Sequence, residues 1–127
     1  MKIEHAALYV RDLEGARAFF ERYFGAESGP EYHNPRTDFR SYFLSFEGGT
    51  RLELMTRPQL EGEDPAAARA GYAHVAFSVG SREAVDRLTD RLRLEGYTVL
   101  SGPRTTGDGY YESCVAGVEG IPVEITI

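Results

Sequence analysis

Two histidines and two glutamates occur at matching places in the two halves of this 127-residue chain. His5 and His74 are 69 residues apart, and Glu53 and Glu124 are 71 residues apart. Neutral imidazole and carboxylate are donors that bind divalent transition metals, and two carboxylates balance the charge of one such ion. We therefore predict that the four side chains gather around one divalent metal, with Zn, Ni, Co, Mn and Fe all compatible with this donor set.

The sequence around these residues repeats with nearly the same offset, which predicts a duplicated structural unit. Residues 3–10 resemble residues 72–79, with histidine third and valine eighth in each. In both halves a strand is followed by a polar cap (Asp12, Ser81) and a helix closed by a glycine (Gly25, Gly96). Three further strands follow each helix, so we predict an α+β fold of two tandem βαβββ modules whose curved, mostly antiparallel sheet surrounds the metal site.

We expect a single domain over residues 1–127, with module 1 at about 1–56 and module 2 at about 72–127. An acidic linker at about 57–71, with room for one helical turn, joins them. The expected strands are 3–10, 27–32, 38–46 and 50–56 in module 1 and 72–79, 97–101, 109–116 and 121–127 in module 2, with helices at 12–24 and 81–94.

Strand alternation predicts where the four side chains point, because successive residues face opposite sides of a sheet. Leu52 and Leu54 suit the core, which turns Glu53 to the other face. The same argument applies to His5, His74 and Glu124 in their strands. All four are therefore expected on the sheet face that the helices leave open.

Composition excludes several classes of function. The hydrophobic content of 42% and the charged content of 27% are those of a globular domain, and no segment suggests a membrane span or a secretory leader. A net charge of −6 disfavours nucleic acid as a partner. We expect a cytoplasmic protein. The one cysteine, Cys114, is expected to be a buried packing residue, and His33 is expected in an exposed polar loop.

The order of these motifs resembles the vicinal oxygen chelate superfamily, and most closely its small members of the glyoxalase I (lactoylglutathione lyase) type, with a glyoxalase/bleomycin-resistance-like fold. The similar segments are Met-Lys-Ile-Glu-His, Arg-Leu-Glu-Leu-Met, Gly-Tyr-Ala-His-Val-Ala-Phe-Ser-Val and the final Val-Glu-Ile, which together cover almost the whole chain. The resemblance implies His5, Glu53, His74 and Glu124 as the metal ligands. It also implies a homodimer in which His5 and Glu53 of one subunit share a metal site with His74 and Glu124 of the other subunit.

The same resemblance implies a chemistry. In the family the metal holds two adjacent oxygens of a hemithioacetal, and a glutamate moves a proton from one carbon to the next. Glu124 matches this catalytic base, and Glu53 is its counterpart in the first half. The implied substrate is a small 2-oxoaldehyde–thiol adduct or a related compound with vicinal oxygens.

Other positions depart from the glutathione-using members. Tyr9 stands where those members have an arginine, and Arg57 stands where they have an asparagine. The identity of the thiol that the protein would use therefore stays open. Arg104 and Arg40 are candidates to bind an anionic substrate. The segment 105–111 reads as a mobile loop over the cavity, with Tyr110 as a contact residue. We therefore name Tyr9, Arg57, Arg104 and Tyr110 as the candidate substrate-binding residues.

Other functions fit the same scaffold. One is an epimerase or a thiol transferase that uses the same metal. Another is a metal-free binding protein of the bleomycin-resistance type that sequesters its ligand. An extradiol dioxygenase fits less well, because its iron keeps three protein ligands and Glu53 would occupy an open position.

Overall fold

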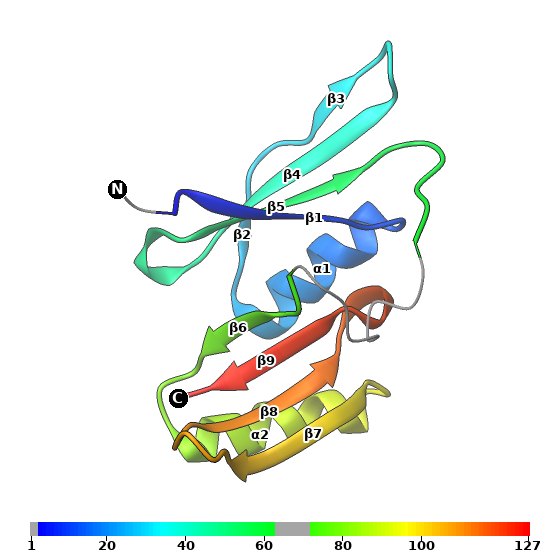
Figure 1. Cartoon of the computed structure of the whole chain (residues 1–127). Helices are drawn as coiled ribbons and strands as arrows, with labels where there is room; N and C mark the ends of the chain where they lie inside the picture. Colours follow the sequence, from blue (N-terminus) through cyan, green and yellow to red (C-terminus); the bar gives the residue numbers. More distant parts are fainter. Residues whose placement is uncertain (1–2, 63–71) are drawn as a thin grey trace. The chain divides into compact units, whose positions relative to one another are not determined.

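The computed structural model describes residues 3–62 and 72–127, and the chain divides into two compact units (Figure 1). We call residues 1–62 module 1 and residues 63–127 module 2. The helical turn was expected in the linker at about 57–71. Residues 63–71 of this linker lie outside the described part of the chain.

Module 1 forms a mixed sheet with a helix on one face. Strand β1 runs parallel to β5, and the remaining pairs are antiparallel, in the order β1-β5-β4-β2 with β3 paired to β4. Its elements are β1 (His5–Tyr9), α1 (Leu13–Phe24), β2 (Glu27–Ser28), β3 (Tyr32–Asn34), β4 (Phe39–Ser45), a 3₁₀ turn (Glu47–Gly49) and β5 (Arg51–Thr56).

Module 2 repeats the plan with a sheet in the order β6-β9-β8-β7, in which β6 runs parallel to β9 and the other pairs are antiparallel. Its elements are β6 (Val75–Ser78), α2 (Arg82–Leu94), β7 (Thr98–Thr105), β8 (Tyr111–Ala116), a 3₁₀ turn (Val118–Gly120) and β9 (Pro122–Thr126). The predicted α+β class and the mostly antiparallel pairing are confirmed.

The predicted caps start both helices. The Asp12 side chain accepts a hydrogen bond from the Gly15 amide at 2.9 Å, and the Ser81 hydroxyl accepts one from the Ala84 amide at 3.2 Å. Each bond satisfies an amide that has no partner inside the helix. Gly25 ends α1 in the left-handed conformation, with φ of 65°, which a glycine adopts without steric cost.

Each core lies between the helix and the strands that it covers. Helix α1 packs on β2, β4 and β5, and α2 packs on β7, β8 and β9. Among the described residues, no helix of the same module covers the opposite face of either sheet (Figure 1). The fully buried side chains of the two cores include Phe20, Leu44 and Leu54 in module 1 and Val85, Leu92, Val115, Val123 and Ile125 in module 2.

Two details of module 1 differ from expectation. The single strand expected at 27–32 is two short ones, β2 and β3, and His33 lies in β3 rather than in a loop. His33 is nevertheless exposed, as expected, and its Nε2 lies 2.8 Å from an Asp38 carboxylate oxygen. None of the helices in the described ranges is long and apolar enough to cross a membrane.

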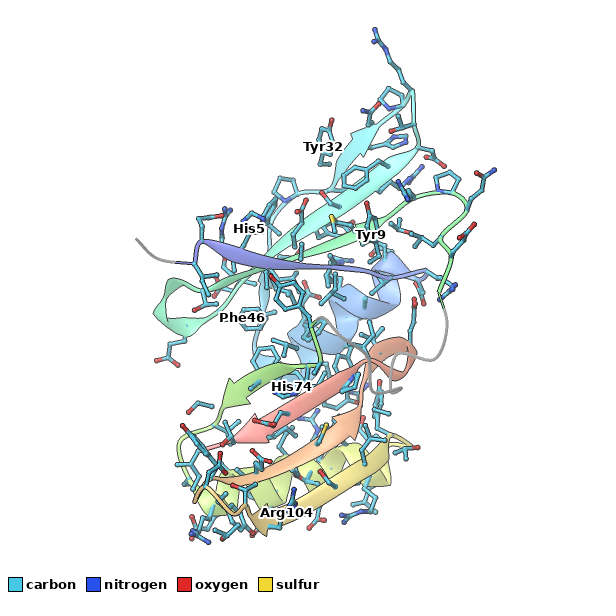
Figure 2. The ribbon with its side chains drawn as sticks, in the orientation of Figure 1. His5, Tyr9, Tyr32, Phe46, His74 and Arg104 are labelled. Atoms are coloured by element: carbon cyan, nitrogen blue, oxygen red, sulfur yellow. The ribbon has the colours of Figure 1, made fainter. Side chains whose placement is uncertain are left out.

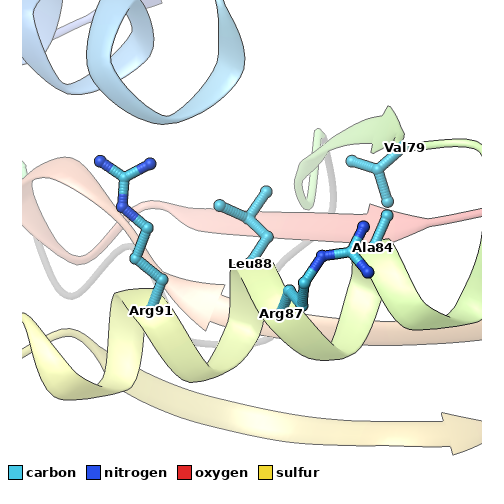
Figure 3. Close-up of a pocket in the computed structure, with 5 residues that line it drawn as sticks. All are labelled: Val79, Ala84, Arg87, Leu88 and Arg91. Atoms are coloured by element: carbon cyan, nitrogen blue, oxygen red, sulfur yellow. The ribbon is translucent and has the colours of Figure 1, made fainter.

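A shallow groove of about 290 Å³ runs along α2 in module 2 (Figure 3). Leu88 is only half-buried here, because Thr89 takes the buried place on the helix. The groove is lined by Val79, Ala84, Arg87, Leu88 and Arg91. It therefore lies on the helix side of the sheet, away from the face on which the four ligands were predicted.

Candidate metal site

In module 1, His5 and Glu53 come together on the open face of the sheet. The register of the parallel strands places Ala7 beside Glu53, and His5 lies two residues before Ala7 on the same face. The His5 Nε2 atom is 3.8 Å from a Glu53 carboxylate oxygen. Leu52 and Leu54 are buried on the opposite face, as alternation predicts. The Glu53 side chain is 17% exposed, so it stays accessible to a small ligand.

The His5 ring is held by two further residues. Its Nδ1 atom contacts the Glu4 carboxylate, and its ring meets the Phe43 ring edge-on with 5.2 Å between centroids. The His5 imidazole, and after it the Arg51 guanidinium, hold the pKa of Glu4 below its usual range. A carboxylate on one ring nitrogen is the usual support for a metal-binding histidine, because it leaves the other nitrogen free to coordinate.

Module 2 repeats this geometry with His74 and Glu124. The register places Ala76 beside Glu124, and His74 lies two residues before Ala76, as His5 does before Ala7. The His74 Nε2 atom is 3.5 Å from a Glu124 carboxylate oxygen, and the Glu124 side chain is 18% exposed. His74 was expected within a strand. It lies one residue before β6, which begins at Val75.

The surroundings of the two glutamates differ. Burial, and after it repulsion from Glu112, raises the pKa of Glu124. The cross-strand neighbour of Glu124 is Cys114, which is half-buried, so the expectation of a buried packing cysteine is wrong. Burial also raises the pKa of the Cys114 thiol, followed by the effect of Glu124. In module 1 the corresponding neighbour of Glu53 is Phe43.

Sequence analysis missed Glu4, Phe43 and Glu112. Strand alternation contains the signal for Glu112, because it lies two residues before Cys114 and so faces the same side of β8. Glu4 and Phe43 have no such signal, since their contacts to the His5 ring depend on side-chain conformations.

Each module by itself offers two ligands. Within either module, no three His, Cys, Asp or Glu side chains of the described residues are placed to hold a metal ion together. Structural and catalytic sites for transition metals usually take three or four protein ligands. The donor chemistry of an imidazole and a carboxylate fits a divalent ion.

The structure brings two of the predicted substrate-binding residues together. Tyr9 lies at the end of β1, on the same face as His5 (Figure 2). The Arg57 guanidinium lies over the Tyr9 ring, 5.4 Å from its centroid. Both residues belong to the module 1 face that carries His5 and Glu53.

The other candidates do not join this pair. Arg104, on β7, pairs across the ladder with Glu112. Arg40 is ion-paired with Glu31 and Asp38, each at 3.3 Å. Tyr110 is exposed beside a tight turn.

That turn replaces the flexible loop expected at 105–111. The Tyr110 amide donates to the Thr106 hydroxyl at 3.0 Å, and the Thr106 amide donates to the Tyr110 carbonyl at 2.8 Å.

Known proteins resemble this chain in sequence and in fold. Residues 2–125 match the family model of the Glyoxalase/Bleomycin resistance protein/Dioxygenase superfamily. The Bacillus subtilis protein YqjT, described as uncharacterized, is 30% identical over 131 residues, covering 97% of this chain and 96% of the relative.

Solved structures share the fold. A glyoxalase family protein from Bacillus cereus superimposes with a TM-score of 0.83 at 20% identity, covering 99% of this chain and 93% of that one. The trypanothione-dependent glyoxalase I of Leishmania major gives 0.78 at 19% identity, covering 99% and 86%. The fosfomycin resistance protein FosX from Listeria monocytogenes, complexed with Mn(II) and sulfate, gives 0.71 at 20% identity, covering 98% and 90%.

Proposed function

Because the chain belongs to the Glyoxalase/Bleomycin resistance protein/Dioxygenase superfamily, we propose that it is a metal-dependent lyase or isomerase of the glyoxalase I type. Its substrate is a small 2-oxoaldehyde–thiol adduct or a related molecule with vicinal oxygens. Among its structural relatives are a glyoxalase I and a protein complexed with Mn(II), which supports both parts of the proposal.

The observation that carries the proposal is the duplication of one histidine–glutamate pair. The Nε2-to-carboxylate distances are 3.8 Å for His5 and Glu53 and 3.5 Å for His74 and Glu124. The same strand register positions both pairs. The duplicated fold accounts for the shared register, but it does not require a histidine and a glutamate at the same two places in both modules. We propose that the four side chains bind one divalent ion.

A divalent ion held by the two histidines and the two glutamates would polarise two adjacent oxygens of the substrate, which would make the proton on one oxygen-bearing carbon easier to remove. In this proposal Glu124 takes that proton and returns it to the neighbouring carbon. Glu53 is the corresponding carboxylate of module 1.

Activity is tested with metal-loaded protein, methylglyoxal and a panel of thiols that includes glutathione. We expect formation of a lactoyl thioester with at least one thiol. Glu124→Gln should abolish turnover, while His33→Ala should leave it unchanged because His33 lies at the exposed β3–β4 ladder. Stoichiometrically metal-loaded protein that turns over no thiol adduct would refute the glyoxalase I assignment.

We further propose that the chain forms a homodimer in which each metal site takes one pair from each subunit. Mixing His5→Ala chains with His74→Ala chains tests this. A mixed dimer of that kind holds one site with all four ligands, so activity should return on mixing. If each site were built within one chain, both chains of the mixture would stay defective and activity would not return.

A further inference from the structure

The open face of module 1 carries an aromatic surface beside His5 and Glu53. One row of paired residues crosses it from β3 through β4 and β5 to β1, namely Tyr32, Ser41, Met55 and Tyr9. Tyr32 and Tyr9 are 57% and 44% exposed, and both are visible in Figure 2, whereas Ser41 between them is 3% exposed. Large side chains therefore flank a small one in the middle of the row.

The fold does not require this surface, because module 2 lacks it. The matching strand registers place Ser78 where module 1 has Tyr9, Thr126 where it has Met55, and Glu112 where it has Ser41. Exposed aromatic side chains that one copy of a repeated unit has and the other lacks point to a binding role.

A positive charge lies at the end of the aromatic row. The Arg57 guanidinium lies over the Tyr9 ring. No carboxylate of residues 3–62 is paired with it, whereas Arg51, which lies over the Phe43 ring, is bound to Glu4. The charge of Arg57 is therefore available to an anionic group of a ligand.

The spacing between these groups defines the shape of that ligand. Met55 lies two residues after Glu53 on the same face of β5, roughly 7 Å along the strand. Arg57 follows directly after the strand, which ends at Thr56, and its guanidinium lies over the Tyr9 ring. A molecule with vicinal oxygens at His5 and Glu53 would lay its body over Met55 and Tyr9. Its far end would come within reach of the Arg57 side chain.

We propose that the substrate is an anion with a flat, apolar body. Its vicinal oxygens bind at the metal site, its body lies on Tyr9 and Met55, and a carboxylate or similar group at the far end binds Arg57. This inference rests on the proposed function, because it places the oxygens at the His5 and Glu53 pair. It assigns Tyr9 and Arg57 as the residues that select the substrate.

Three chelating probes test it by isothermal titration of the zinc-loaded protein. They are 3,4-dihydroxybenzoate, its neutral amide 3,4-dihydroxybenzamide, and catechol. All carry the same vicinal oxygens, and the first alone adds a carboxylate at the far side of the ring. We expect the acid to bind about tenfold or more tightly than the amide, as a charge-assisted hydrogen bond predicts.

Two variants locate the effect. Arg57→Gln should remove the preference for the acid over the amide without weakening catechol, and Tyr9→Ser, which introduces the module 2 residue, should weaken all three probes. Arg36→Gln is the matched control, because Arg36 is an exposed arginine of the same module that lies away from the aromatic row.

The outcomes separate this inference from the proposed function. Equal binding of acid and amide, or a preference that survives in Arg57→Gln, would overturn the inference while catechol binding still supported the metal site. Failure of all three probes to bind zinc-loaded protein would overturn both. Equal losses in Arg36→Gln and Arg57→Gln would show a general charge effect and would also overturn the inference.

Discussion

Cys114 lies directly opposite Glu124 in the antiparallel ladder of β8 and β9, so its thiol shares the open sheet face with the proposed catalytic base. Its chain neighbours Ser113 and Val115 are buried on the other face. The alternation of side chains along β8 therefore separates residues that build the core from residues that border the site.

This separation predicts that two adjacent substitutions change stability by different amounts. Cys114→Ser should change the free energy of unfolding by less than about 1 kcal/mol, because the side chain fills no core space. Val115→Ala should cost about 1–3 kcal/mol, since it removes two fully buried methyl groups. Urea denaturation of the metal-free protein measures both. A larger loss for Cys114→Ser than for Val115→Ala would contradict the assignment of faces.

A hydroxyl pair ties α2 to β8 inside the core of module 2. The Thr89 hydroxyl donates to the Val85 carbonyl at 2.6 Å and lies 2.6 Å from the Ser113 hydroxyl. Thr89→Val should cost about 1–3 kcal/mol, because it leaves the buried Ser113 hydroxyl without this partner. Ser113→Ala added to Thr89→Val should recover part of that loss. Strictly additive losses in the double-mutant cycle would show that the two hydroxyls are not coupled.

The contact between Tyr42 and Glu14 predicts a pH dependence of stability in module 1. The Tyr42 hydroxyl donates to the Glu14 carboxylate at 2.6 Å, and this bond, more than the neighbouring Arg17, holds the pKa of Glu14 below its ordinary value of 4.5. A carboxyl with a lowered folded-state pKa stabilises the fold above its unfolded pKa, and this contribution is lost as pH falls through the folded value.

Tyr42→Phe should therefore be less stable than the unaltered chain at about pH 6, and the difference should shrink toward about pH 3. Urea denaturation across this range provides the measurement, and Tyr110→Phe, which changes an exposed tyrosine, is the control. A difference that stays constant with pH would mean that the Glu14 carboxylate does not contribute through this bond.

Periodicity predicted the parts of the fold that depend on a clear contrast between apolar and polar residues. Leu52 and Leu54 flank Glu53, so the phase of β5 follows from the sequence, and the structure confirms both leucines in the core. Asp12 and Ser81 likewise mark the helix starts by their hydrogen-bonding chemistry. The ligation of metal by the four predicted residues stays a prediction.

Other features depend on contacts that no local pattern contains. Cys114 lies in the run Ser-Cys-Val-Ala, where either phase of the strand gives an acceptable core, and only the pairing with β9 decides between them. Thr89 is buried on α2, where its hydroxyl bonds to the Ser113 hydroxyl of β8, while the neighbouring Leu88 is only half-buried. The pairing of Tyr9 with Arg57 joins residues 48 positions apart in the sequence.

The central claim is that the two histidine–glutamate pairs bind one ion together. Competition with a fluorescent chelator for Zn²⁺ or Ni²⁺ measures it, and we expect one ion per chain. Substituting His5, Glu53, His74 or Glu124 one at a time should weaken binding by at least about a hundredfold, exceeding the usual effect of an outer-sphere residue, whereas His33→Ala should have no effect. Two ions per chain, each lost on substitution of one pair alone, would contradict the shared site. Protein that is purified without metal, and whose free energy of unfolding does not change when the ion is added, would favour a binding protein without metal.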